Sequence, residues 1–264
     1  MTGVRLATWN INSVRARAER VGAWLARSDV DVVMLQETKC RDDQFPHELF
    51  TQAGYEVAHH GLSQWNGVAI ASRVGLDDVE TAFPGMPGWG DPVAAEARAI
   101  GATCGGVRVW SLYVPNGRAL GDPHYAYKLE WLARLREAGA GWLAQDPQAQ
   151  VALGGDWNVA PQDEDVWDIS VFDGATHVSP PEREAFAAMV AAGYADVVRP
   201  HTPGQYTYWD YKQLAFPKRR GMRIDFVLAS PALAARVAGA SIDREERKGK
   251  CASDHAPVVV ELAG

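Results

Sequence analysis

The spacing of apolar residues along the chain predicts many short strands interrupted by helices. Segments in which apolar residues alternate with polar ones, or form short continuous runs, are typical of strands. Those segments are residues 4–10, 30–35, 55–59, 67–71, 94–103, 107–114, 150–153, 224–229, 240–242 and 257–262. Apolar residues at helical spacing predict helices instead, over residues 15–27, 44–53, 124–143 and 180–192.

The order of these segments predicts the fold class. Strands and helices are mixed along the whole length, and no repeat, linker or break in composition divides the chain. A length of 264 residues suits one large domain, so we expect a single α/β domain over residues 1–264. Strands grouped in pairs, with helices between them, predict two sheets packed together and covered by helices.

Polar side chains stand at the ends of several apolar strands. Residues 151–153 are apolar, and two glycines then lead to Asp156, Trp157 and Asn158. On an extended chain Asp156 and Asn158 share one face, which places Trp157 on the opposite face, in the core. Similar polar clusters occur at residues 8–12, 36–38, 113–116 and 253–255. Each cluster alone is also what an ordinary turn or helix cap contains.

One carboxylate lies inside an apolar strand. Asp225 stands between Ile224 and Phe226, where an ionised group is costly unless it is paired. His255 is a suitable partner, because a carboxylate fixes the tautomer of an imidazole. A buried Asp–His pair also occurs in purely structural roles, so the pair alone does not decide between structure and catalysis.

Taken together, the polar clusters share a chemistry. They offer carboxylate and carboxamide oxygens, which suit Mg²⁺, or Mn²⁺ as an alternative, better than zinc. The residues are Glu37, Asp156, Asp225 and Asp254, with Asn10, Asn12, Asn116 and Asn158. Carboxylates, one histidine and a divalent cation are what phosphodiester hydrolysis requires.

The net charge of the chain and the charge of one segment give opposite indications about nucleic-acid binding. The chain carries 26 basic and 33 acidic side chains, a net charge of −7, which argues against general nucleic-acid binding. Residues 208–223 are nevertheless basic and aromatic. They contain Lys212, Lys218, Arg219, Arg220 and Arg223 against Asp210, interleaved with Tyr208, Trp209, Tyr211 and Phe216. Such a stretch is typical of a solvated loop or of a nucleic-acid-binding surface.

The cysteines and the absence of targeting signals predict the compartment. Cys40, Cys104 and Cys251 are far apart and fit neither a zinc site nor a disulfide framework, so we expect them to be small core residues. We find no signal peptide and no apolar stretch long enough to span a bilayer. These features predict a cytoplasmic protein without a membrane partner.

Six motifs, in this order, resemble one known family. They are WNIN (9–12), LQETK (35–39), YVPNG (113–117), GDWNVAP (155–161), RGMRID (220–225) and SDHAPV (253–258). The pattern resembles the exonuclease III family of abasic-site endonucleases, within the endonuclease/exonuclease/phosphatase superfamily, from residue 4 to about residue 262. The resemblance implies a four-layer α/β sandwich: two mixed sheets face to face, helices outside, and an active site at one end.

The resemblance also implies roles for metal and phosphate ligands. Glu37 matches the principal Mg²⁺ ligand of the family, with Asn10 and Asp254 close to the metal. Tyr113 and Asn116 match groups that hold the target phosphate.

The implied reacting groups lie in three motifs. Asp156 matches the carboxylate that orients or deprotonates the attacking water, which Asn158 helps to position. His255, oriented by Asp225, matches the imidazole that contacts the scissile phosphate. Either Asp156 or His255 fits the role of general base.

Because the superfamily also contains sphingomyelinases, inositol-phosphate phosphatases and nonspecific deoxyribonucleases, the fold does not choose the substrate. Three features favour duplex DNA with a missing base. The first is the LQETK motif, and the second is Arg118, just beyond the phosphate-binding loop. The third comprises Tyr208, Trp209, Met222 and Ile224, which resemble the apolar pocket for an extrahelical abasic sugar. The resemblance thus implies a monomeric Mg²⁺-dependent repair enzyme that cuts 5′ to abasic sites and also works on 3′ ends.

Two other functions are compatible with parts of the pattern. A phosphoesterase acting on a lipid headgroup or a nucleotide phosphate is disfavoured by the basic aromatic loop. A non-catalytic DNA-binding module is disfavoured because every position of the implied catalytic set is present. One departure concerns the acids at residues 163–165, which weaken binding if they face DNA, or else begin a short helix.

Overall fold

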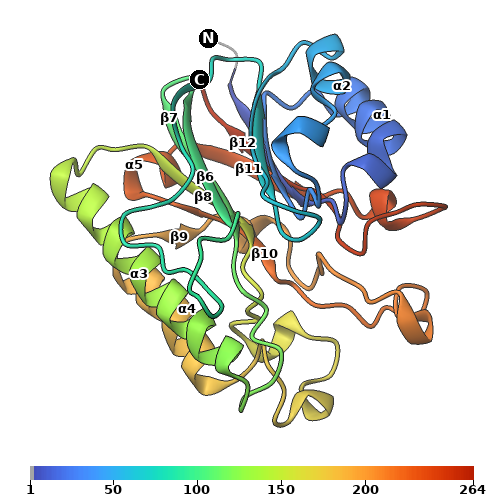
Figure 1. The fold of residues 1–264 in the computed structure, drawn as a ribbon, viewed down its shortest axis with the longest axis vertical. Coiled ribbons are helices and arrows are strands. Elements are labelled where there is room, and N and C mark those ends of the chain that lie inside the picture. The colour runs from blue at the N-terminus through green and yellow to red at the C-terminus, as the bar shows by residue number, and fades with distance from the viewer. Residues whose placement is uncertain (1–2) are drawn as a thin grey trace.

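Two six-stranded sheets form the centre of the computed structural model, which describes residues 3–264 (Figure 1). Sheet A has the spatial order β11 (Val237–Ile242), β12 (Val258–Leu262), β1 (Arg5–Asn10), β2 (Val32–Gln36), β4 (Val68–Ser72) and β3 (Glu56–His60). Sheet B has the order β5 (Asp77–Glu80), β6 (Ala99–Cys104), β7 (Val107–Tyr113), β8 (Val151–Asp156), β10 (Asp225–Ala229) and β9 (Ala195–Asp196). β1 and β2 run parallel, as do β7 and β8, and the other pairs are antiparallel, so both sheets are mixed.

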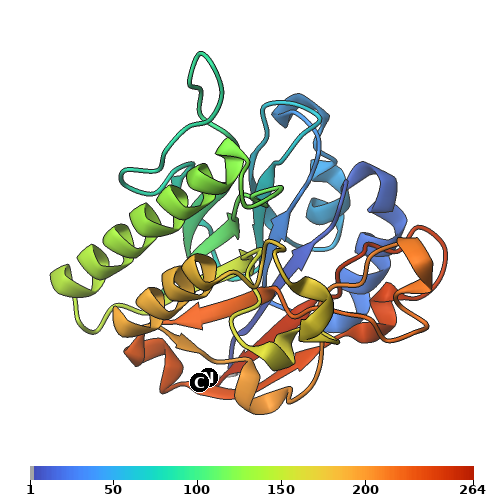
Figure 2. The ribbon, with the colours of Figure 1, turned by 90° about the horizontal axis from the view of Figure 1, so that it is seen from below.

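Helices cover the outer face of each sheet. α1 (Ala18–Ser28) and α2 (His47–Gln52) lie on sheet A, whereas α3 (Pro123–Gln145) and α4 (Pro180–Ala191) lie side by side on sheet B (Figures 1 and 2). Trp24 of α1 packs with Trp9 of β1, and Trp131 of α3 joins the cluster that contains Trp110 of β7. The predicted four-layer sandwich is therefore confirmed.

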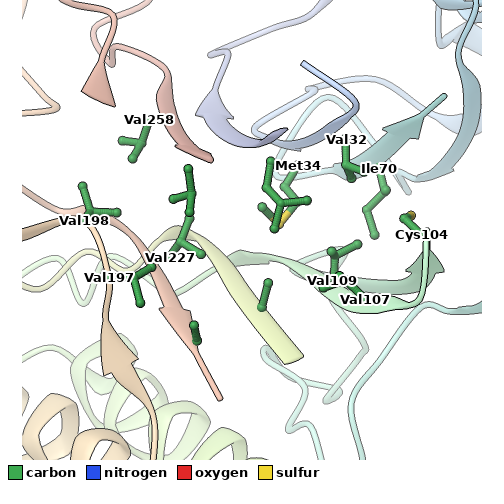
Figure 3. Packing of buried hydrophobic residues seen from close by; sticks show 14 of the residues in the cluster. Val32, Met34, Ile70, Cys104, Val107, Val109, Val197, Val198, Val227 and Val258 are labelled. Carbon is green, nitrogen blue, oxygen red and sulfur yellow. The ribbon is translucent and has the colours of Figure 1, made fainter. Parts of the chain in front are cut away.

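The inner faces of the two sheets bury the central apolar core. Met34, Ile70 and Val258 from sheet A meet Val109 and Val227 from sheet B (Figure 3). Full burial of each such side chain stabilises the fold by about 1.5–3 kcal/mol. Because this core fills the space between the sheets, polar groups can gather only at an end of the sandwich.

A pair of buried hydroxyl and carboxamide groups ties the sheets together near that end. The Gln36 side-chain nitrogen donates to Ser111 Oγ at 2.9 Å, and Ser111 Oγ donates to the carbonyl of Leu35 at 2.8 Å. Both side chains are fully buried, so these bonds satisfy groups that would otherwise be costly. They also set the end of β2 against β7.

Most predicted elements are present, with boundaries that differ by a few residues. The predicted strand at residues 94–103 begins only at Ala99, because Trp89 and Ala94 pair within a turn that precedes it. The strand predicted at 150–153 continues to Asp156, through both glycines. The pattern did not indicate β5, β9 or the short α5 (Pro231–Ala234).

Single residues test the core predictions. Trp157 is fully buried, as expected, and so are Cys40 and Cys104. Cys251 is exposed, so the prediction of a core position for it was wrong. Its backbone has a positive φ of 57° in a turn between the last 3₁₀ segment and β12, outside any sheet. Among residues 3–264 no helix is long and apolar enough to cross a membrane.

The two ends of the chain lie together, away from the polar strand ends. The Leu262 N–H donates to the carbonyl of Val4 at 2.9 Å, where β1 begins and β12 finishes. Figure 1 shows both termini on one side of the sandwich and the long loops before β10 on the other.

The glycines of β8 allow a close approach of neighbouring chain. A Cβ on Gly155 would lie 1.9 Å from the carbonyl oxygen of Leu112, in the backbone of β7. A Cβ on Gly154 would lie 2.5 Å from the terminal methyl of Met34, which is the end of a flexible side chain.

These contacts predict that alanine destabilises the protein by different amounts at Gly154 and Gly155. Gly155→Ala must push β7 and β8 apart, so we expect it to lower the free energy of unfolding by about 3 kcal/mol or more. Gly154→Ala should cost clearly less, because the Met34 side chain can change rotamer. Urea unfolding of both variants measures the difference, and equal costs would contradict this account.

Candidate active site

The register of the strands places the predicted side chains next to one another, at the same end of the sandwich. In sheet B, Tyr113 of β7 and Asp225 of β10 both pair with Asp156 of β8. In sheet A, Asn10 is the last residue of β1 and pairs with Gln36 of β2. The candidate site therefore forms where strands of both sheets end, beside the yellow and orange loops in Figure 1.

Asn10 holds two carboxylates next to each other. Its side-chain nitrogen donates to Glu37 Oε1 at 2.8 Å and to Asp156 Oδ2 at 3.0 Å. Its side-chain oxygen accepts from the backbone N–H of Asn12 at 3.1 Å. Asn10 thus presents its donor face to the acids and reduces the repulsion between them.

The predicted Asp–His pair is present and buried. His255 Nδ1 lies 2.8 Å from Asp225 Oδ2, and its Nε2 lies 3.7 Å from Asp156 Oδ2. Burial alone would lower the pKa of His255, but Asp225 and Asp156 outweigh it and raise that pKa to about 10. The imidazole is therefore protonated at neutral pH.

For Asp156, burial has a larger effect on the pKa than the neighbouring charges have, which is the reverse of the situation at His255. Burial raises the pKa of its carboxyl to about 7; Asp225 and Glu37 add to the rise, and His255 opposes it. A carboxyl group that titrates near neutrality can accept a proton under physiological conditions, which is the property of a general base.

The same cluster can hold a divalent cation. Glu37, Asp156 and His255 each offer a ligand atom within 4.8 Å of the others. Burial would raise the pKa of Glu37, but Lys39 and the bond from Asn10 outweigh it and lower that pKa. Because His255 carries a proton, the available ligands are carboxylate oxygens, which fit Mg²⁺ or Mn²⁺.

Asp254 joins this cluster indirectly. Its Oδ1 accepts from the Asn12 side-chain nitrogen at 3.0 Å. The Lys39 ammonium then donates to Asn12 Oδ1 at 2.6 Å and to Glu37 Oε2 at 2.7 Å. Asp254 is thus adjacent to the three-residue group rather than part of it.

The predicted phosphate-binding groups adjoin the acid cluster, since Tyr113 pairs with Asp156 across the strands and has Glu37 as a neighbour. Burial and the neighbouring Glu37 raise the pKa of the Tyr113 phenol well above its ordinary value, so it remains a hydrogen-bond donor. The Asn116 side-chain nitrogen donates to Asn158 Oδ1 at 3.2 Å, and the Asn158 backbone N–H donates to Asp156 Oδ1 at 2.9 Å. Arg118 extends outward from this loop with its guanidinium over the Trp89 ring.

The backbone is strained where these side chains are presented. Several non-glycine residues of the site have φ in the left-handed region, which costs energy unless the surroundings hold it. They are Asn12, Glu37, Lys39, Arg118, Asn158 and His177. Their grouping at one end of the sandwich is typical of a functional site.

Two residues at the site were missed from the sequence. Lys39 lies in the LQETK motif, and its position two residues after Glu37 was a signal for the ion pair. His177 lies in no motif; its Nε2 is 3.1 Å from Asn158 Oδ1 and its Nδ1 is 2.9 Å from Thr176 Oγ1. Burial and the Lys128 ammonium lower the pKa of His177 to about 3, so it is neutral.

A hollow lies at two of the four residues predicted to form the sugar pocket. Tyr208 and Met222 line a hollow of about 260 Å³, together with Trp167 and Phe172, which the sequence did not indicate. The Tyr208 ring lies 4.9 Å from that of His255, so the pocket adjoins the Asp–His pair.

Trp209 and Ile224 do not line this pocket, so that part of the prediction needs correction. Trp209 is 2 % exposed and packs on Phe216, with its backbone N–H bonded to Asp254. Ile224 is equally buried and packs with Val166. Trp209 is the neighbour of Tyr208 and its side chain faces the core, whereas Ile224 comes directly before β10 and is enclosed in the cluster of Ala160 and Val166.

The basic loop is less basic than its sequence indicates. Arg223 is buried and donates to Asp165 Oδ1 at 2.7 Å and to Asp196 Oδ2 at 2.8 Å. The exposed basic side chains are Lys212, Lys218 and Arg219, with Arg220 over the Trp167 ring at the pocket, and the acid Asp210 is exposed as well.

The acids at residues 163–165 form the short helix considered above, of the 3₁₀ type. Each of them is paired with an arginine: Asp163 with Arg183, Glu164 with Arg199, and Asp165 with both Arg199 and Arg223. Their charge is therefore largely neutralised within the protein.

Comparison with known proteins identifies the class to which this site belongs. Residues 7–255 match the Endonuclease/Exonuclease/phosphatase family, and the chain is a member of it. Exodeoxyribonuclease III of Haemophilus influenzae is 29% identical over 98% of this chain and 100% of its own. The 3′ phosphatase NExo from Neisseria, solved with a product DNA hairpin, is 35% identical, with a TM-score of 0.92 over 99% of this chain and 100% of its own. An AP endonuclease from Archaeoglobus fulgidus is 33% identical, with a TM-score of 0.90 over 98% and 99%.

The family identified from the six motifs is thus confirmed, and with it the prediction that the protein is an enzyme of the hydrolytic nuclease type. The relatives differ in the reaction for which they are named, since 3′ phosphatase and AP endonuclease both occur among them.

The pKa of Asp156 predicts how turnover depends on pH. Below about pH 7 this carboxyl is protonated and cannot accept a proton, so kcat should rise with pH and level off above about 7. A cation beside the carboxylate would move the midpoint lower without changing the sign. Single-turnover rates at saturating Mg²⁺ provide the measurement, and a profile that falls over this range would contradict the assignment.

Proposed function

We propose that the chain, as one domain and a monomer, is a Mg²⁺-dependent DNA repair nuclease. It hydrolyses the phosphodiester 5′ to abasic sites in duplex DNA and removes groups or nucleotides from 3′ ends. The observation that carries the proposal is the position of the acid cluster and the Asp225–His255 pair directly beside a pocket with aromatic side chains in its lining. A cytoplasmic location is part of the proposal, supported by relatives from bacteria, in which the genome lies in the cytoplasm.

Glu37 and Asp156 are the groups that would hold the cation, with Asp254 nearby. Ionised carboxylates clustered this closely need a compensating positive charge, so the donor set fits a divalent ion. When bound, the cation neutralises phosphate charge. Lys39 and Asn10 keep Glu37 ionised and oriented for this purpose.

The protonation states favour one assignment of the base. His255 is already protonated, because its pKa is raised to about 10, and it donates from Nε2 to a phosphate oxygen. Asp156, which titrates near neutrality, orients the attacking water and accepts its proton. Asn158 helps to position that water, while Tyr113 and Asn116 donate to the phosphate.

The pocket supports the choice of substrate. A nucleotide without a base leaves the helix at low cost. Its sugar would contact the aromatic and Met222 side chains of the hollow of about 260 Å³, which charged side chains such as Asp210 and Arg220 also line. Tyr208 and Met222 line the hollow together with Trp167 and Phe172, and we expect these four side chains to favour a sugar without a base. The exposed Lys212, Lys218, Arg219 and Arg118 approach the DNA backbone.

Activity on 3′ ends is the second half of the proposal, favoured by the name of the Neisseria relative. A terminal phosphate reaches the acid cluster without an extrahelical sugar, so it does not require the pocket. Phosphoester hydrolysis of a lipid headgroup or nucleotide phosphate is the alternative, and the same assay tests it.

One experiment separates these activities. A duplex with a tetrahydrofuran abasic analogue, a hairpin with a 3′ phosphate, an intact duplex and phosphorylcholine esters are incubated with the enzyme and Mg²⁺. The proposal expects incision of the first and phosphate release from the second. Cleavage of the esters without any reaction on DNA would establish the alternative instead.

Loss of the metal ligand should stop the reaction. Glu37→Gln keeps the shape of the side chain but removes the charge, so we expect incision to fall by at least about a hundredfold. EDTA should have the same effect on the unchanged enzyme. Gel assays of incision measure both, with Glu19→Gln on the exterior of α1 as the control variant. Full activity in EDTA would show that the cation assignment is wrong.

Filling the pocket should separate the two DNA activities. In Met222→Trp the larger ring occupies the hollow, so abasic-site incision should fall at least about tenfold, with much less effect on 3′ phosphate release. Leu214→Trp, in the same loop but exposed, is the matched control. Equal losses on both substrates would mean that the pocket does not select the abasic sugar.

A further inference from the structure

A fully buried ion pair lies behind the phosphate-binding loops. Lys128, in the first turns of α3, and Glu182, in the first turn of α4, are both 0% exposed, and the Lys128 ammonium bonds directly to Glu182 Oε1. Neither residue belongs to the catalytic cluster, and none of the six motifs contains them.

The other contacts of Lys128 reach the candidate site. Its ammonium donates to the carbonyl oxygen of Asn158 at 2.6 Å and to that of Asn116 at 3.3 Å. These are the two residues whose side chains meet at 3.2 Å beside Asp156. With Glu182 as the third acceptor, all three ammonium protons are used.

Glu182 anchors the pair on the opposite side. Its Oε2 accepts from the Ser179 backbone N–H at 3.2 Å and from Ser179 Oγ at 2.5 Å, which fixes the start of α4. Glu182 therefore holds the Lys128 ammonium in one position. Through its bonds to the carbonyl oxygens of Asn116 and Asn158, the ammonium fixes the main chain of both loops.

A purely structural link between α3 and α4 would not need charges. Removing two charges from water is costly, and an apolar pair of similar volume is often as stable or more stable. Phe186 and Met189 of α4 already pack in one apolar cluster with Trp131 and Leu135 of α3. The ion pair thus does something that apolar packing does not, namely bond two main-chain carbonyls.

We propose that Lys128 and Glu182 form a positioning pair that fixes the main chain at Asn116 and Asn158, so that both carboxamides face the reacting phosphate. This rests on the proposed function, because it assigns those carboxamides to the phosphate and the water. His177 supports the arrangement, because its Nε2 lies 3.1 Å from Asn158 Oδ1. Burial and the Lys128 ammonium keep the pKa of His177 low, so its ring is neutral.

The test uses a variant that loses both charges together. Lys128→Met alone leaves the buried Glu182 carboxylate without a positive partner, so the melting temperature of this variant should fall sharply. The double variant Lys128→Met/Glu182→Gln removes both charges and keeps an acceptor for Ser179, so most of the loss in melting temperature should be restored. Its kcat on the abasic duplex should nevertheless stay about a hundredfold low, with little change in KM or in the Mg²⁺ concentration for half-maximal rate.

A second readout does not depend on activity. Hydrogen exchange of the amides at 116–118 and 158–160 should become faster in the double variant, while β8 remains protected. Arg134→Met/Glu137→Gln, an exposed pair on the same helix, is the control and should behave like the unchanged protein.

The outcomes are distinct. A double variant with unchanged kcat, or with unchanged exchange in both loops, would overturn the positioning role. If the unchanged protein cuts no DNA, the proposed function fails, and unchanged loop exchange would still overturn the positioning pair on its own.

Discussion

The close approach of β7 to β8 is the constraint on which the rest of the site depends. Only a residue without a side chain fits at Gly155, facing the backbone of Leu112. This contact extends the parallel pairing to the ends of both strands, where Tyr113 stands level with Asp156. Antiparallel pairing then places Asp225 at the same level. The geometry of the acids is thus a result of backbone packing.

Charge pairing explains how so many ionisable groups remain buried in one place. Asp156 is stabilised by donors from Asn10 and the Asn158 backbone, and by the protonated His255 that Asp225 maintains. No single partner would offset the desolvation of these charges, because each is buried. The network is therefore interdependent, and its pKa values belong to the group rather than to isolated residues.

The sequence predicted the sheets, the helices and the gathering of polar groups at the strand ends because these follow from local spacing and from motifs. Asp156 and Asn158 share a face by strand periodicity, and the isolated charge of Asp225 required a partner. What could not be predicted depends on tertiary packing. Whether Tyr208 or Trp209 faces the pocket follows from the pairing of an irregular segment with Met222. The burial of Arg223 depends on acids distant in sequence, and His177 has no local pattern at all.

The adjacency of the chain ends has a practical consequence. Val4 and Leu262 are bonded to each other at the start of β1, whereas the catalytic cluster lies at its finish, roughly 20 Å along the strand. A fluorescent label, a surface linker or a fused protein attached next to Val4 or after Leu262 would lie at the end of sheet A opposite the acid cluster. Attachment to a surface at this place would leave the end of the sandwich with the acid cluster open to solvent. The same adjacency makes the protein a suitable scaffold for circular permutation, with new ends placed in an exposed loop.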